Sequence, residues 1–304
     1  MTDRTDPWGD FWAQNARARP GQASPDGGGC LPARWAAIED AQRSAWQSFV
    51  GPLPNKARLL DLATGDGRVL RWIRDNRGDL SLTGTDLAPT LPEAPEGTRT
   101  QGGIAMEDLP FEPDSFEAVT SQFGFEYGDT RAGAEQVARV LAPGGLVGLL
   151  VHRGDGPILE HNRARRDQIG WVLRDKRLME ATRQALSAPQ GAQQAHDTAA
   201  AAAREGAERF GSTSPAWEIA EAVRRTIVMG ARSGVQSIVD TIGSIERHAT
   251  NEVGRIDSLE GACRVADARE KLTGHFAAHG LALQSTEPVR EPSGRAFGDF
   301  LTFA

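Results

Sequence analysis

The chain has 304 residues, of which 39% are hydrophobic and 25% are charged, and it carries a formal net charge of -7. This length allows one large domain or two small ones with a substantial buried core, and the composition is typical of a globular protein. The negative charge gives no general attraction to polyanions, so it argues against nucleic acid as a partner.

Cysteine usage and the first residues predict where the protein acts. The two cysteines, Cys30 and Cys263, lie in no metal-ligand spacing and no disulfide framework, which predicts reduced thiols, a cytoplasmic location and no metal site. Residues 1–6 lack the apolar core of a signal peptide, and no apolar run approaches the ~20 residues that span a bilayer. We therefore expect no membrane association.

The N-terminal segment, residues 1–56, is unusually rich in tryptophan. It holds four of the seven in the chain: Trp8, Trp12, Trp35 and Trp46. Residues 19–32 are rich in Gly, Pro and Ser and predict a loop, whereas the apolar spacing in residues 32–50 predicts a helix. Two interpretations stay open: a helix packed on the domain that follows, or a lid over a ligand pocket.

From Ala57 onward, short apolar runs alternate with helical patterns. Strands are expected at residues 57–62, 80–86, 98–105, 116–122 and 146–151. Helices are expected at residues 68–76 and around Ala134 to Leu141, where the apolar spacing is helical and the helix is predicted to stop at Pro143-Gly144-Gly145. Strands joined by helical connections predict a doubly wound parallel sheet.

The alternation then gives way to a long helical section. Residues 157–251 show no strand pattern, only helical stretches such as 171–188, 199–203, 216–229 and 233–247. A crossover needs only about a dozen residues, so this section predicts a helical cap inserted after the fifth strand.

The end of the chain is expected to complete the sheet. A helix at residues 258–278 and strands at 281–289 and 296–303 predict a Rossmann-like, seven-stranded, mostly parallel sheet with an antiparallel edge pair. The expected organisation has four parts: 1–56, a lid segment; 57–156, the core; 157–251, the helical cap; and 252–304, the last helix and two strands.

The stretch from Leu59 to Gly67 predicts a ligand site. An apolar strand ends in an acid and passes through a glycine-containing turn into a helix, which is the arrangement that cradles a nucleotide-like ligand. Asp86 follows 19 residues after Gly67, at the end of the next strand. A carboxylate there accepts hydrogen bonds from ribose hydroxyls, so both nicotinamide and adenosyl cofactors fit at this point.

Three further motifs distinguish between a nicotinamide and an adenosyl cofactor. Met106 to Phe111 (MEDLPF), then Asp114 to Phe116 (DSF), then Arg139 to Gly145 (RVLAPGG) stand in the order and at the distances found in class I S-adenosylmethionine-dependent methyltransferases. Over about residues 57–153 and the last two strands, the chain resembles in particular the group that includes the ubiquinone and menaquinone biosynthesis C-methyltransferases. An NAD-dependent oxidoreductase would leave the Leu-Pro-Phe and Pro-Gly-Gly stretches without a role.

The resemblance implies S-adenosylmethionine as the cofactor and a role for each matching residue. Backbone groups of the loop would pass close to the methionine moiety, Asp61 would hold its ammonium group, and Asp86 would hold the ribose. Leu87 would lie against the adenine, whose edge would meet the Met106 backbone and the Glu107 side chain, and the strand end at 122–123 would border the sulfonium and the acceptor. The implied cofactor residues are Asp61, Ala63, Thr64, Gly65, Gly67, Asp86, Leu87, Met106, Glu107, Gln122 and Phe123.

Two positions depart from the family pattern. Ala63 stands where the family's loop has its first glycine. Alanine restricts the backbone conformations that the turn can adopt. Ala105 stands where an acid often receives the adenine amino group, and Glu107, two residues further on, is the expected replacement.

Methyl transfer depends mainly on alignment and on exclusion of water, and it needs a general base only when the acceptor must lose a proton. The candidates are His152, Glu126, Tyr127 and His161. Structural interpretations stand beside these: His152 bonded to a carbonyl, Glu126 paired with an arginine of the cap such as Arg163, Tyr127 as a pocket wall, and His161 on a solvated helix.

The leading hypothesis is a methyltransferase acting on a small molecule. Residues 153–183 hold eight Arg or Lys against five Asp or Glu, which would suit an anionic substrate or RNA, but Trp171 is the only ring there for stacking bases. An RNA methyltransferase therefore ranks second. A third hypothesis is a catalytically silent cofactor-binding protein, and the amphipathic stretches 216–229 and 233–247 predict a homodimer through the helical insertion.

Overall fold

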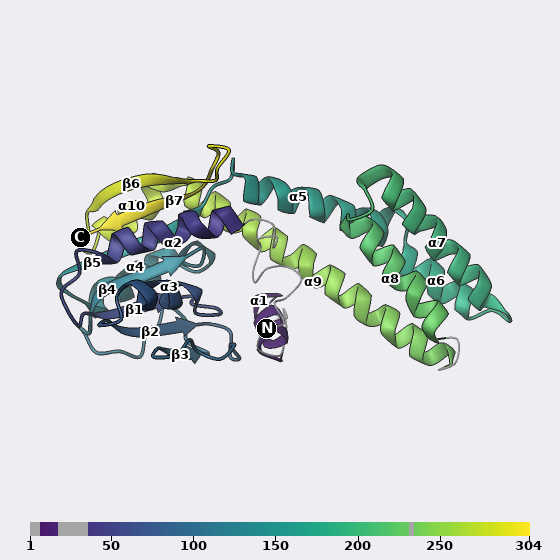
Figure 1. Ribbon diagram of the computed structural model, residues 1–304, viewed down its shortest axis with the longest axis horizontal. Helices are drawn as coiled ribbons and strands as arrows, with labels where there is room; N and C mark the ends of the chain where they lie inside the picture. Colours follow the sequence, from purple (N-terminus) through teal and green to yellow (C-terminus); the bar gives the residue numbers. More distant parts are fainter. Residues whose placement is uncertain (1–6, 18–35, 231–233) are drawn as a thin grey trace. The chain divides into compact units, whose positions relative to one another are not determined.

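The computed structural model describes residues 7–17, 36–230 and 234–304 (Figure 1). Contacts divide the chain into two compact units. Unit 1 comprises the described residues up to Leu159 together with Ser258–Ala304, and unit 2 is Glu160–Asp257. The two boundaries fall inside helices α5 (Pro157–Gly170) and α9 (Val235–Asp267). None of the helices within the described ranges has the length and apolarity needed to cross a bilayer.

Unit 1 is built on a seven-stranded sheet. Its strands are β1 (Arg58–Leu62), β2 (Ser81–Asp86), β3 (Arg99–Gly102), β4 (Phe116–Gln122), β5 (Leu141–His152), β6 (Leu283–Arg290) and β7 (Ala296–Phe303). The spatial order is β3-β2-β1-β4-β5-β7-β6. Strands β1 to β5 pair in parallel, and β7 runs antiparallel to both neighbours, which confirms the predicted fold class. The order reverses between β1 and β4, and such a switch point is where an open α/β sheet binds its ligand.

Helices cover both faces of this sheet, which explains why its central strands β1 and β4 are buried along most of their length. Besides the ends of α5 and α9, the helices of unit 1 are α1 (Pro7–Arg17), α2 (Ala36–Val50), α3 (Arg68–Asn76), the short 3-10 helix η1 (Phe125–Tyr127), α4 (Thr130–Val140) and α10 (Arg269–Ala277). One core contains residues of α2 and α3, and the other contains residues of α4 and α10.

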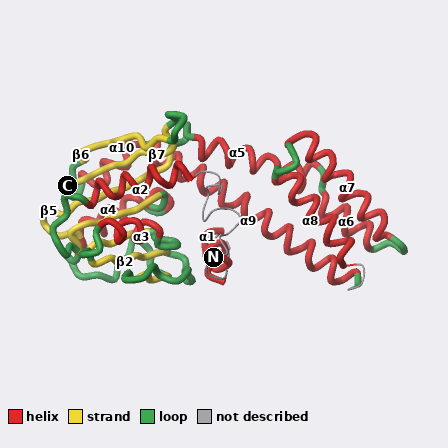
Figure 2. Tube along the Cα trace, in the orientation of Figure 1, coloured by secondary structure: helices red, strands yellow, loops and turns green. Residues whose placement is uncertain are grey.

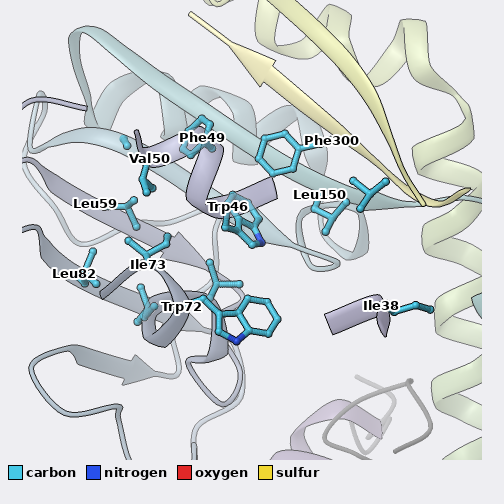
Figure 3. Close-up of a cluster of buried hydrophobic side chains, with 14 of the residues drawn as sticks. Ile38, Trp46, Phe49, Val50, Leu59, Trp72, Ile73, Leu82, Leu150 and Phe300 are labelled. Carbon is cyan, nitrogen blue, oxygen red and sulfur yellow. The ribbon is translucent and has the colours of Figure 1, made fainter. Parts of the chain in front are cut away.

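Helix α2 packs on the sheet. Trp46 is fully buried, and its ring meets Phe300 of β7 edge-on at 4.8 Å; Phe49 and Leu150 belong to the same core (Figure 3). The packed-helix interpretation therefore describes α2. The predicted loop at residues 19–32 lies outside the described residues. Helix α1 was not predicted.

The Pro-Gly-Gly stretch does not terminate a helix, contrary to the sequence expectation. Helix α4 ends at Val140 because Leu141 already has extended backbone angles and pairs with Phe116 of β4. Residues 142–145 then form an irregularity inside β5, and regular pairing resumes at Leu146 with Ala118. Gly144 has a positive φ of 75°, which explains why glycine suits this bulge.

The described residues of unit 2 form helices joined by turns, without a strand among them (Figure 2). It contains most of α5, the π-helix η2 (Trp171–Asp175), α6 (Leu178–Leu186), α7 (Gly191–Phe210), α8 (Pro215–Gly230) and the start of α9. Buried small residues such as Ala199, Ala203 and Gly206 lie on α7, and Gly206 packs near the backbone of α8. The alanine-rich stretch is therefore the packed face of a helix in a separate core.

Two predicted helices have different limits in the structure. The expected helix at residues 171–188 is interrupted at Arg177, whose φ is +47°, between η2 and α6. The expected helix at residues 258–278 is the end of α9 followed by α10, with a break at Ala268. Helix α9 runs through residue 257 without interruption because no proline or cap separates the helical patterns on either side. Cys263 on α9 is a buried free thiol, while Cys30 lies outside the described residues.

Candidate active site

A cavity of about 310 Å³ in unit 1 opens at the carboxyl ends of the parallel strands. Most of the residues predicted to bind cofactor or act in catalysis line it: Asp61, Ala63, Thr64, Gly65, Asp86, Leu87, Met106, Glu107, Gln122, Phe123, Tyr127 and His152. Gly67, Glu126 and His161 are not among its lining residues, and His161 belongs to unit 2. The topology thus gathers residues from β1, β2, β4 and β5 around one space.

The loop after β1 exposes its backbone to this cavity. Ala63, Gly65 and Gly67 all have positive φ angles, of 53°, 53° and 69°. Ala63 therefore adopts the conformation for which a glycine is ordinarily used, at a cost of about 1 kcal/mol. A side chain at Gly65 would collide with the Trp12 indole, whereas one at Gly67 would collide with Pro95. Gly67 is therefore required by packing beside the site.

Asp86 fastens this loop to β2. Its Oδ2 accepts a hydrogen bond from the Gly65 amide and its Oδ1 accepts one from the Ala88 amide, both at 2.9 Å. Asp86 also lines the cavity, so its carboxylate is presented to hydroxyl donors of a ligand. The predicted ribose-binding acid is consequently also the residue that orders the loop.

Asp61, at the end of β1, is a buried carboxyl group with one open oxygen. Its Oδ1 accepts a hydrogen bond from Thr120 Oγ1 at 2.8 Å, while Oδ2 has no hydrogen-bond partner among the described residues. Burial raises the pKa of Asp61 to about 7, and the nearby Asp86 and Asp66 carboxylates add to the rise. An ammonium group beside Oδ2 would relieve this penalty.

The opposite wall suits a flat, apolar ligand edge. Leu87 is 63% exposed although it is a large apolar residue, and it lines the cavity. Glu107 Oε1 accepts a hydrogen bond from the Asp129 amide at 2.7 Å, which fixes the carboxylate beside Met106. Gly128 leaves the space that both side chains need, because a Cβ there would collide with each of them.

Gln122 is held from behind by α2. Its Oε1 accepts a hydrogen bond from Trp46 Nε1 at 2.7 Å, and its Nε2 donates to Gln42 Oε1 at 3.4 Å. The next residue, Phe123, has a positive φ of 53°. Such backbone strain in a bulky residue is concentrated at functional sites in proteins. Helix α2 therefore contributes to the site indirectly, through a buried amide.

His152 and Glu126 form a buried pair at the end of β5. Glu126 Oε1 lies 2.8 Å from His152 Nδ1 and also accepts a hydrogen bond from the His152 backbone amide at 2.9 Å. The exposed fractions of the two residues are 3% and 1%. Oε2 of Glu126 has no hydrogen-bond partner in the described part of the chain. The expected pairing of Glu126 with Arg163 stays a prediction, since Arg163 belongs to unit 2.

Several lining residues were missed by sequence reasoning. Trp8 and Trp12 of α1 line the cavity, and the Trp8 ring meets Tyr127 edge-on at 5.7 Å. Asp66 and Arg68, which form a 2.8 Å ion pair within the loop, also line it. The concentration of tryptophan in the N-terminal segment was the available signal for α1, but nothing in the sequence showed which rings face the site.

The fold and this geometry agree with what comparison finds. Residues 60–149, from β1 into β5, match the family described as "Methyltransferase domain". These residues form a methyltransferase domain. The predicted class I S-adenosylmethionine-dependent methyltransferase core, and S-adenosylmethionine as its cofactor, are thereby confirmed for the part of the chain that matches.

Curated relatives of this domain include proteins named for quinone methylation. A demethylmenaquinone methyltransferase of Thermotoga maritima is 35% identical over 100 residues, which are 32% of this chain and 44% of that protein. A ubiquinone/menaquinone biosynthesis C-methyltransferase of Geotalea daltonii is 36% identical over 121 residues, 35% of this chain and 51% of that protein. The chain thus spans about half the length of these relatives.

Proposed function

We propose that the whole protein is an enzyme that transfers a methyl group from S-adenosylmethionine to a small-molecule acceptor by in-line displacement. The observation that carries this proposal is the cavity at the switch point, which brings the open carboxylate oxygen of Asp61, the loop at 63–67 and Asp86 together inside the methyltransferase domain. Its volume of about 310 Å³ lies at the lower end of small-molecule sites.

The residues present fit the cofactor. The unpartnered Asp61 Oδ2 would take the ammonium group, Asp86 would take the ribose hydroxyls, and Leu87 would cover one face of the adenine. Met106 and Glu107 would meet the adenine edge. When bound, S-adenosylmethionine supplies an electrophilic methyl group on a sulfonium, and Gln122 and Phe123 would border it.

The protein's own contribution would be positioning and exclusion of water. The loop presents backbone groups because Gly65 has no side chain, and Trp12 packs directly on that position. Trp8 and Tyr127 add an aromatic wall. In this proposal α1 is the part of the N-terminal segment that closes on the pocket, while α2 supports Gln122 from the core.

The RNA alternative is not favoured by the charges in residues 153–183. Most cations of that section are engaged by carboxylates: Arg153 by Asp155 and Asp299, Arg165 by Glu252, Arg166 by Asp257, Lys176 by Glu205, Arg177 by Glu180 and Arg183 by Glu246. Cations already paired within the protein release few counterions on binding phosphate. Affinity for bulk tRNA that fell steeply with salt would reverse this ranking.

Titration calorimetry with S-adenosylmethionine and with its demethylated product tests the proposal. We expect both to bind, and we expect Asp86→Ala to abolish detectable binding because it removes the ribose acceptor and unfastens the Gly65 amide. Asp75→Asn, an exposed position on α3, is the matched control and should bind like the natural protein. Absence of binding of either compound at high micromolar concentration would overturn the proposal.

Two further predictions belong to this proposal. A homodimer through the helices of unit 2 would raise the light-scattering mass at increasing protein concentration, and a constant monomer mass would contradict it. The cytoplasmic location predicted from cysteine usage would place the enzyme beside its cofactor pool, and cell fractionation checks it.

A further inference from the structure

The hydrogen bonds between Glu126 and His152 determine which nitrogen of the His152 imidazole carries the hydrogen. Glu126 Oε1 receives both the backbone amide and Nδ1 of the same residue, at 2.9 and 2.8 Å. A carboxylate accepts hydrogen bonds, so Nδ1 must carry the hydrogen. The neutral imidazole then presents Nε2 as a lone-pair acceptor.

His152 lines the cavity, whereas Glu126 lies behind it. With Nδ1 committed to Glu126, Nε2 is the ring nitrogen available to a molecule in the cavity. The Phe123 ring covers the imidazole at 4.2 Å with an angle of 30°, and Tyr127 meets it edge-on at 5.8 Å. The ring is therefore restrained by a carboxylate and two aromatic neighbours.

We propose, building on the methyltransferase activity proposed above, that His152 is the general base for a phenolic acceptor and that Glu126 is the residue that positions it. The acceptor is then an aromatic hydroxyl compound, and the product is an aryl methyl ether. This differs from the carbon methylation in the name of the Geotalea daltonii relative.

Proton affinities favour a phenol over other acceptors. Imidazoles titrate near ~6.5 and phenols near ~10, so an imidazole removes a phenolic proton at a disadvantage of about 10³ to 10⁴, which departure of the neutral thioether leaving group can offset. The pKa of an aliphatic alcohol lies several units further above that of an imidazole. A thiol, near ~8.5, ionises with little help. An alkylammonium, near ~10.4, needs a base as a phenol does, but the aromatic walls of the cavity favour the phenol ring.

The walls of the cavity agree with an aromatic acceptor. Trp8, Trp12, Phe123 and Tyr127 all line it, and the rings of Trp8, Tyr127 and His152 follow one another by edge-on contacts of 5.7 and 5.8 Å. Aromatic rings prefer such edge-on or offset neighbours, so a flat ring is favoured in this space.

The step balances as follows. The acceptor oxygen forms a bond to the methyl carbon while the bond from that carbon to sulfur breaks, and its electron pair stays on sulfur. The hydroxyl proton passes to His152 Nε2, and solvent removes it after product release. Glu126 keeps its place, stabilising the imidazolium through Nδ1–H.

Other charged groups lie near the Glu126–His152 pair, called the dyad from here on, and they also contribute to the pH dependence of activity. The remaining titratable residues that line the cavity are Asp61, Asp66, Arg68, Asp86, Glu107 and Tyr127. Directly after β5, Arg153 is held by Asp155 and by Asp299 of β7. An effect specific to the dyad must therefore appear in Glu126 and His152 variants and be absent when surface charges are changed.

The test is a panel of simple phenols assayed with methyl-labelled S-adenosylmethionine, with products identified by NMR. We expect aryl methyl ethers from the natural protein and a loss of about 10² to 10⁴ in kcat for His152→Gln. Glu126→Gln keeps an acceptor oxygen and should lose about 10-fold or more. Its kcat–pH profile should shift its acid limb to lower pH, because the imidazolium loses a neighbouring negative charge.

Controls separate a base from a merely structural pair. His279→Gln and Glu135→Gln change the same residue types at exposed positions and should keep natural kcat. A nitrophenol that is already ionised at the assay pH needs no base, so both dyad variants should recover most of their activity with it. Equal losses with ionised and neutral phenols would overturn the assignment.

The outcomes also distinguish this inference from the proposed function. If S-adenosylmethionine binds but no phenol is methylated, or if the product carries its methyl group on carbon, the phenol assignment fails and the methyltransferase proposal stands. If neither S-adenosylmethionine nor its demethylated product binds, the proposed function itself fails.

Discussion

Two buried carboxyl groups lie beside the cavity, Asp61 near the end of β1 and Glu126 in η1, and comparing them shows what decides whether a carboxylate binds a ligand or orients a neighbouring side chain. Asp61 and Glu126 are each 1% exposed, and each has one hydrogen-bonded oxygen and one without a partner in the described residues. Asp61 lines the cavity directly, whereas His152 stands in front of Glu126. The first carboxylate is suited to bind a ligand cation, and the second is suited to orient an imidazole.

The largest expected effect is the pH dependence of folding stability that Asp61 causes. The folded pKa of Asp61 is about 7, above its ordinary value of 3.8, so the folded protein retains a proton that the unfolded chain releases between these values. Stability of the ligand-free protein should therefore fall as pH rises from about 4 to 7, by up to about 4 kcal/mol. Urea denaturation across this range measures the fall.

Asp61→Asn is the matched variant for that measurement. The amide oxygen can still accept the Thr120 bond but cannot ionise, so the part of the pH dependence due to residue 61 should disappear. An unchanged stability–pH curve in this variant would assign the dependence to other groups.

A somewhat smaller effect is expected on cofactor affinity. Asp61→Asn should weaken S-adenosylmethionine binding by about 100-fold, or ~2.7 kcal/mol, because a charged partner for the ammonium group is lost. In the natural protein the Kd should tighten by about 10-fold from pH 6 to pH 8, as Asp61 ionises through a pKa of about 7. Calorimetry at several pH values checks both statements, and a Kd independent of pH would contradict the second.

The smallest effect sharpens the comparison. Glu126→Gln should leave the Kd for S-adenosylmethionine within about 2-fold at every pH from 6 to 8, because Glu126 reaches the cavity only through His152. A loss of affinity comparable to that of Asp61→Asn would mean that both carboxylates serve the cofactor, and the two carboxylates would then not differ in role.

The sequence predicted the sheet and its order of elements well because short strand patterns bounded by turn residues alternate with helical patterns. It misplaced the end of α4, since the pairing of Leu141 with Phe116 extends β5 back across the Pro-Gly-Gly stretch. It also divided the continuous α9, because helical patterns alone show no difference between a loop and an uninterrupted helix.

For the site, residues belonging to local motifs were predictable and contacts across the fold were not. Asp61 and Asp86 follow strands in a recognisable pattern, and the structure puts both at the cavity. The hydrogen bond from Trp46 to Gln122 spans 76 positions of the chain, and that between Glu126 and His152 spans 26, so only the packing of α2 and η1 on the sheet creates them. Spacing rules carry no information about such partners.

The hydrogen bond between the His152 amide and the Glu126 side chain has a consequence for observing the enzyme at rest. A backbone hydrogen held by a side chain exchanges with solvent only when that side chain departs, so deuterium uptake at this single amide reports how often η1 lifts away from the end of β5. The opening frequency of the proposed base assembly can thus be followed without substrate, cofactor or turnover.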